Sequence, residues 1–148
     1  MDAITLLKDD HRRFKKMLEE GEETTERAVK TRKELLERLA ADLKAHEKIE
    51  EEIFYPALKE YEKAKEIVLE GYEEHHVADL ILAELRKTDV TDERWGAKFS
   101  VLKENLEHHI EEEEEDMFKK ARAVLEKAEL VELGERMQAV KQRARRAA

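Results

Sequence analysis

Two short segments of the sequence each carry a histidine and, four residues later, a glutamate. The first pair is His46 and Glu50, and the second is His109 and Glu113. On an α-helix, residues i and i+4 lie one above the other on the same face. Both pairs fall within apolar stripes and should face a core, where a carboxylate is costly unless it is paired or coordinates a metal ion. The pattern therefore predicts a metal site.

The two segments belong to a twofold internal repeat. A further histidine precedes each segment, His11 by 35 residues and His75 by 34, and an acidic residue stands directly before each of these histidines. An aromatic residue follows at the ninth position after the second histidine of each half, as Tyr55 and Phe118. Each half of the chain is thus expected to be a helix with one histidine, followed by a helix with a histidine and a glutamate.

The helical faces separate the six histidines of the chain. His76 and His108 are turned toward a flank and are expected at the surface or beside the ligands rather than among them. Glu51 is rotated away from His46 and should be exposed, and Tyr55 should pack at the end of the bundle. The candidate ligands are the inward-facing set His11, His46, Glu50, His75, His109 and Glu113.

Two metal ions suit this set of donors. In an antiparallel bundle, one histidine per helix can meet at a common level, and Glu50 and Glu113 can bridge two ions about 3.5–4 Å apart. Each ion would then have two histidines and two bridging oxygens, with room for a solvent bridge and an external ligand. Mixed imidazole and carboxylate ligation suits iron, and also manganese or zinc, and affinity order alone would favour zinc over iron.

Long amphipathic helices must position these residues. Pro56 removes one helical hydrogen bond and is expected to end or kink the second helix near Phe54 and Tyr55. Short connectors between four long segments predict an all-α, antiparallel, up-down-up-down bundle at about 2–127, with a short fifth helix at about 129–146. The expected helices are 2–26, 29–58, 60–87, 93–127 and 130–146.

Composition agrees with this architecture and excludes several functions. The 148 residues fit one domain, and charged residues make up 45% of the chain. A net charge of −9 argues against a nucleic-acid partner, and the absence of cysteine excludes disulfides, thiolate metal sites and cysteine nucleophiles. With no apolar run of about 20 residues and no leader segment, we expect a cytoplasmic protein without membrane contact, as a monomer or weak homodimer.

Taken together, the motifs resemble those of the hemerythrin-like, or HHE cation-binding, family. The resemblance extends from Asp10 and His11 to Phe118, over nearly the whole chain. It implies a four-helix bundle that holds two iron ions with an oxo or hydroxo bridge. Family members carry or sense oxygen, bind nitric oxide, decompose peroxide or sense iron. It also implies Glu47 as an additional ligand, because some members use an acidic residue directly after this histidine.

Two positions depart from the oxygen-carrying hemerythrins. Those proteins have a further histidine where this chain has Asp79, and an aspartate five residues after the last histidine, where this chain has Glu114. The expected function is therefore a di-iron protein that reacts with peroxide or dioxygen, with catalase-like peroxide decomposition, rather than an oxygen carrier. The alternative left open is a protein that binds or senses oxygen, nitric oxide or iron without turnover.

Overall fold

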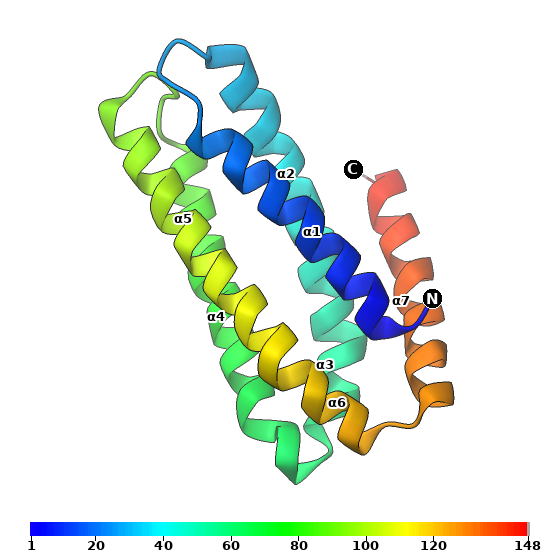
Figure 1. Ribbon diagram of the computed structural model, residues 1–148. Helices are drawn as coiled ribbons and strands as arrows, with labels where there is room; N and C mark the ends of the chain where they lie inside the picture. The colour runs from blue at the N-terminus through cyan, green and yellow to red at the C-terminus, as the bar shows by residue number, and fades with distance from the viewer. Residues whose placement is uncertain (148) are drawn as a thin grey trace.

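The computed structural model describes residues 1–147, which form four long helical rods and a fifth helix alongside them (Figure 1). No strand occurs within these residues. The predicted all-α bundle with an extra C-terminal helix is confirmed. In chain order the elements are α1 (Ala3–Glu22), α2 (Val29–Ile49), the π-helical turn η1 (Glu50–Phe54), α3 (Tyr55–Lys59), α4 (Glu62–Arg86), α5 (Glu93–Glu112), the π-helical turn η2 (Glu113–Met117), α6 (Phe118–Val124) and α7 (Lys127–Ala147).

Short polar side chains set the helix ends. The Asp2 carboxylate accepts a hydrogen bond from the Thr5 backbone N–H at 2.8 Å and caps α1. Asp92 caps α5 by accepting from the Arg94 N–H at 2.8 Å. Helix α1 ends four residues earlier than expected, because the Thr24 hydroxyl donates to the Gly21 carbonyl at 2.6 Å and the chain turns there.

The fourth rod also ends earlier than predicted, at Val124. Leu125 is extended, with φ −111° and ψ 138°, so the helix cannot continue to residue 127. The Glu126 N–H donates to the Glu129 carboxylate at 3.0 Å, which helps to start the next helix. Lys127 therefore belongs to α7 and not to the bundle rod.

The second and fourth rods each contain one π-helical turn, at equivalent places in the two repeats. The turn begins at Glu50 in one rod and at Glu113 in the other. The chain then continues as a helix through Pro56 to Lys59, because a proline in the first turn of α3 lacks only an N–H that the helix start does not need. The expected irregularity near Phe54 is thus a π-turn rather than a helix end.

A layer of polar residues divides the apolar core of the bundle into two parts. On α1, Leu7 belongs to one apolar cluster and Phe14 to the other, and His11 lies between them. The other three rods repeat this arrangement, so that His46, His75 and His109 occupy the same level as His11. The two apolar clusters hold the rods in register, and the polar layer between them is the candidate site.

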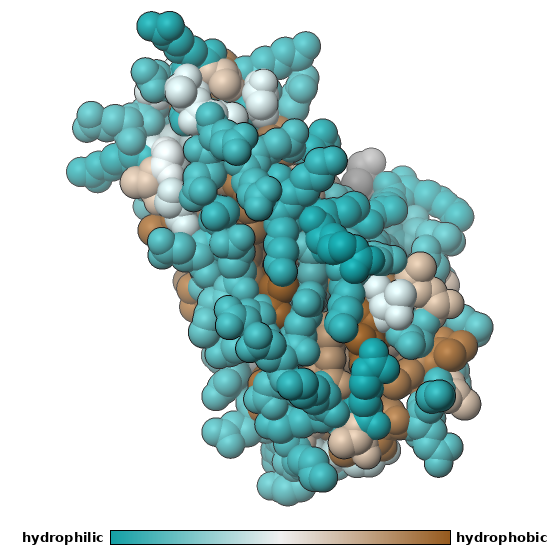
Figure 2. Space-filling model, in the orientation of Figure 1, coloured by the Kyte–Doolittle hydropathy of each residue, from teal (hydrophilic) through white to brown (hydrophobic). Residues whose placement is uncertain are grey.

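Helix α7 packs against α1, α2 and η1. Its buried residues Leu130, Leu133 and Met137 join the apolar cluster at the end of the bundle where the chain begins. On the face seen in Figure 2, hydrophobic side chains are exposed mainly near this end, whereas hydrophilic side chains cover most of the rest. Within residues 1–147, none of the helices has the length and apolar character that crossing a bilayer requires.

Candidate metal centre

The structure brings all six predicted ligands together in the polar layer. None of them is more than 5% exposed. Their nitrogen and oxygen atoms form two overlapping groups of four, and within each group these atoms lie within 4.8 Å of one another. Glu50 and Glu113 belong to both groups. The first group adds His11 and His46, and the second adds His75 and His109.

Each of the four histidines donates its Nδ1–H to a carboxylate. This hydrogen bond fixes the tautomer and turns Nε2 toward the centre, as is usual for histidines that bind metals through Nε2. The Nδ1–oxygen pairs are His11 with Glu114 at 2.6 Å, His46 with Asp10 at 2.8 Å, His75 with Glu51 at 2.7 Å, and His109 with Glu74 at 2.5 Å.

These four carboxylates follow the twofold repeat. Asp10 and Glu74 directly precede the first histidine of their halves, and each pairs with the second histidine of the same half. Glu51 and Glu114 directly follow the two glutamates shared by both groups, and each pairs with the first histidine of the other half. Glu51 was expected to be exposed, and its side chain is 38% exposed, but its pairing with His75 was not predicted. The repeated acid at equivalent positions was the signal that could have identified these partners.

The inner face of the centre contains buried polar atoms that are not fully satisfied. The His75 Nε2 lies 2.9 Å from Glu50 Oε1, and the His11 Nε2 lies 3.0 Å from Glu113 Oε1. In contrast, Glu50 Oε2 and His109 Nε2 are buried without a hydrogen-bond partner. Such atoms are rare in folded proteins unless an ion or a ligand completes them, so the donor set fits a metal.

Electrostatic coupling in the layer is strong. Burial lowers the pKa of His46, but Glu50 and Asp10 outweigh it and raise this pKa to about 10. Burial raises the pKa of Asp10, but His46 and Lys141 outweigh it and lower this pKa to about 2. The pKa of His109 is raised well above its usual value, because Glu113, Glu50 and Glu74 together outweigh burial. Without metal, the positive charges of protonated imidazoles therefore balance the negative charges of the carboxylates.

Tyr55 also enters the centre, although its position in the sequence suggested packing at the bundle end. Its hydroxyl donates to Glu113 Oε2 at 2.6 Å and lies 3.3 Å from both Glu50 Oε1 and His75 Nε2. The ring stacks on His75 with the centroids 5.4 Å apart. The phenol oxygen of Tyr55 thus lies beside the group formed by Glu50, His75, His109 and Glu113.

Three other candidates lie outside both groups. Glu47 is half-buried and contacts Asp79, and burial together with Asp79 raises its pKa to about 9. His76 is exposed. His108 is 67% exposed, and with Glu74 and Glu112 it forms a separate group nearer the surface.

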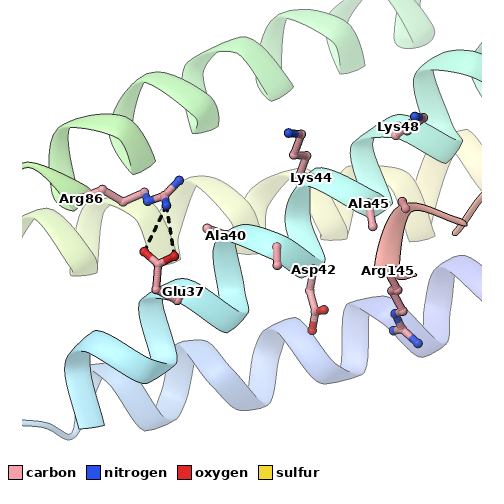
Figure 3. A pocket seen from close by; sticks show the side chains of 10 residues that line it. Glu37, Ala40, Asp42, Lys44, Ala45, Lys48, Arg86 and Arg145 are labelled. Carbon is pink, nitrogen blue, oxygen red and sulfur yellow. Dashed lines mark hydrogen bonds and ion pairs between the residues drawn. The ribbon is translucent and has the colours of Figure 1, made fainter. Parts of the chain in front are cut away.

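The surface hollows do not contain the predicted ligands. One hollow of about 500 Å³ lies between α2 and the end of α7, where Arg86 of α4 donates to both Glu37 oxygens at 3.1 Å (Figure 3). Its lining carries charges of both signs. A second hollow of about 520 Å³, over α4 and α5, is bordered by Glu74, the partner of His109. The centre itself is enclosed, since its six candidate ligands are at most 5% exposed.

A helical bundle with a buried layer of four histidines and two shared glutamates defines a metal-binding bundle of the hemerythrin type. The chain belongs to the hemerythrin HHE cation-binding domain family, whose model matches residues 2–121. It is similar to the crystal structure of a hemerythrin HHE cation-binding domain-containing protein from Mycobacterium kansasii, described as an Rv2633c homolog. The TM-score is 0.88 and the identity 29%, over 99% of this chain and 89% of that one. No curated protein matches the chain significantly.

Proposed function

We propose that the polar layer binds two metal ions bridged by Glu50 and Glu113. The observation that carries this proposal is the pair of overlapping groups, which share both glutamates and contain one histidine from each rod. The orphaned Glu50 Oε2 and the four histidines anchored through Nδ1 support it. One ion would also be held by His11 and His46, and the other by His75 and His109.

The proposed native metal is iron. Two imidazoles and two carboxylates per ion, with no thiolate in the sequence, suit iron or manganese as well as zinc. Membership of the cation-binding family supports a metal but does not select among these ions, so metal analysis is the first test.

The proposed reaction is the decomposition of hydrogen peroxide to water and dioxygen. A pair of iron ions would supply the two-electron chemistry, since one peroxide molecule must gain two electrons and another must lose two. The chain supplies an enclosed site, because the six ligands are at most 5% exposed. Such enclosure favours peroxide or a diatomic gas over larger substrates.

Tyr55 is suited to hold a proton for this reaction. Reduction of one peroxide to two waters consumes two protons, and oxidation of the next to dioxygen releases two. A group that stores a proton between the two halves would keep it inside the enclosed site. The Tyr55 hydroxyl holds its proton 2.6 Å from Glu113 Oε2 and 3.3 Å from Glu50 Oε1. The role proposed for Tyr55 is to give this proton to the substrate and to take it back, while Glu113 directs the hydroxyl and would hold the two ions.

The test combines metal analysis with oxygen evolution. Protein expressed with iron should contain two irons per chain by mass spectrometry and should release dioxygen from hydrogen peroxide faster than the same amount of free iron. His75→Ala should lose iron and this activity. His76→Ala is the matched control, because the neighbouring histidine is exposed and lies outside both groups, and it should retain both.

Each outcome separates the parts of the proposal. Protein that binds no metal, or a single zinc, would contradict the di-iron assignment. Two irons without oxygen evolution above free iron would contradict the peroxide reaction. In that case, spectral titration with dioxygen or nitric oxide would test a binding or sensing function at the same centre.

A further inference from the structure

Helix α7 sends one lysine into the bundle, where it contacts the outer edge of the metal centre. Lys141 is only 6% exposed, and its Nζ contacts Asp10 Oδ1. Lysine is rarely buried to this extent unless it is paired. The other oxygen of the fully buried Asp10 accepts the Nδ1–H of His46 at 2.8 Å. A continuous chain of contacts thus leads from α7 through one carboxylate to a candidate metal ligand.

We propose that Lys141 is a positioning residue of the metal centre, which fixes His46 through Asp10 and strengthens metal binding in the half formed by His11 and His46. The inference rests on the metal binding proposed above. It assigns to α7, which lies outside the four rods that hold the ligands, a part in determining the properties of the centre.

The geometry of the Asp10 carboxylate explains how this works. Oδ2 accepts from His46, whereas Oδ1 receives the Lys141 ammonium and the Arg13 guanidinium, the latter at 2.6 Å. Arg13 is 42% exposed, so solvent screens its charge and its long side chain constrains the carboxylate weakly. Lys141 is the buried partner, and it is the group that holds the plane of the carboxylate and hence the direction of the imidazole.

Within residues 1–147, the other half of the centre has no such lysine contact. Glu74, which occupies the place of Asp10 in the second repeat, accepts from His109 but is 23% exposed and borders a surface hollow. Another acid, Glu112, lies close to it. Figure 1 shows α7 lying along α1 and α2, on the side away from α4 and α5. The two halves therefore have the same kinds of candidate ligand, but only the carboxylate that holds His46 is itself held by a buried lysine.

Docking of the helix does not by itself require this lysine. Leu130, Leu133 and Met137 already bury the apolar face of α7, and removing a lysine from water has a cost that a salt bridge only partly offsets. A contact that served only to hold α7 would not be missed in a variant whose apolar stem keeps the helix docked, and both ions would then leave at the wild-type rate. A positioning role predicts instead, with α7 still docked, faster release of one of the two metal ions.

The experiment measures the release of ferrous iron from anaerobically loaded protein to a coloured chelator. Two ions per chain are expected for the wild type. In Lys141→Met, which keeps the length and the apolar stem of the side chain, one of the two ions should leave about tenfold faster while the other is unchanged, in line with the effect of removing outer partners of ligating histidines. Lys141→Arg should restore slow release, because it returns a cation to Asp10.

Lys103→Met is the matched control. Lys103 is an 18% exposed lysine on α5 that pairs with Glu22 and Glu107, away from the centre. It should release both ions at the wild-type rate. Should Lys141→Met fail to give the helical circular dichroism of the wild type, Lys141→Gln, which keeps a neutral donor, takes its place with the same expected result.

The results distinguish the two proposals. Equal acceleration for both ions, unchanged release, or the same change in Lys103→Met would overturn the positioning role and leave the dinuclear centre standing. Wild-type protein that takes up no iron under these conditions would overturn the centre itself, and the role of Lys141 with it.

Discussion

At the scale of single residues, the two repeats differ most clearly at one hydroxyl group. Tyr55 stacks on His75, and Phe118 stacks on His11 at a centroid distance of 5.8 Å, so the rings occupy equivalent places. Only the tyrosine supplies a proton, which it donates to Glu113. In Tyr55→Phe, metal content should stay at two ions per chain, whereas oxygen evolution should fall about a hundredfold, the lower end of the range expected when a proton-transfer group is lost.

The control for this variant is Tyr72→Phe. The Tyr72 hydroxyl donates to the backbone carbonyl of Glu51 at 3.2 Å and contacts no candidate ligand, so its loss should leave the rate nearly unchanged. Equal losses in both variants, measured with an oxygen electrode, would mean that packing rather than the Tyr55 proton supports turnover.

Glu47 offers a second test on the residue scale. Burial and the neighbouring Asp79 raise its pKa to about 9 in the metal-free protein, above the value of about 4.5 in an unfolded chain. Folding therefore takes up a proton at pH 7, and this contribution to stability is lost as the pH rises from about 4.5 to 9. Glu47→Gln should raise the free energy of unfolding by about 1 kcal/mol at pH 7 and flatten its pH dependence.

The same variant tests whether Glu47 binds metal. Because Glu47 lies outside both groups of ligand atoms, Glu47→Gln should still hold two ions per chain. Loss of an ion by mass spectrometry would instead favour the additional-ligand role that the family resemblance implied. Denaturant unfolding of the metal-free protein at pH 5, 7 and 9 supplies the stability measurement.

At the scale of the helices, Gly71 of α4 makes room for the tyrosine. A Cβ at this position would lie 2.8 Å from the Tyr55 hydroxyl oxygen and 3.0 Å from its Cζ. Alanine favours a helix over glycine by about 1 kcal/mol, but the overpacking typically costs about 1–3 kcal/mol. Gly71→Ala should therefore lower the melting temperature and displace Tyr55.

Gly96 of α5 provides the opposite case. A Cβ there meets no heavy atom within 4 Å, so Gly96→Ala should gain helix propensity and raise the melting temperature. Thermal unfolding of both variants in the metal-free state makes the comparison. A stabilised Gly71→Ala protein would show that Tyr55 can move without cost, and the close contact would then have no functional meaning.

The π-turns explain which parts of the site the sequence could predict. The four histidines and the two shared glutamates lie before the turns or at their first residue, where the regular helical period still holds. The period therefore places them on the inward faces of their helices. On a regular α-helix, Tyr55 would point about 180° away from His46. The π-turn η1 inserts an extra residue per turn and rotates Tyr55 and Glu51 toward the centre. The helical periodicity of the sequence does not reveal that extra residue.

At the scale of the whole molecule, the fold was predictable because the apolar stripes and the short connectors leave few arrangements for four amphipathic rods. The attachment of α7 was not. Its apolar face could equally have met a second chain, and only the structure places Lys141 against Asp10. Gly134 allows α7 to pack closely against the start of the chain, since a Cβ there would clash with the backbone of Met1.

In the proposed centre, metal ions and protons would compete for the same atoms, and this competition would link the stability of the whole molecule to pH. Without metal, the pKa of His46 is raised to about 10 from an unfolded value near 6.5. The stabilisation from this charged imidazole is complete below pH 6.5 and is lost as the pH rises toward 10. With metal bound, the ion replaces the proton, and a higher pH strengthens binding because fewer protons compete.

The melting temperatures of metal-loaded and metal-free protein should therefore diverge as the pH rises. Chelation should lower the melting temperature clearly at pH 7, and the difference should be larger at pH 9 than at pH 6. Over this range the imidazoles of the unfolded chain lose their protons while those of the folded metal-free protein keep them, so the stabilisation of the metal-free protein shrinks. Differential scanning calorimetry at the three pH values, with metal removal verified by mass spectrometry, measures the effect. If the melting temperatures of the two forms changed with pH in parallel, metal binding would not displace protons from the histidines. If the chelated protein were as stable as the loaded one, the polar layer would have only a structural role in the bundle.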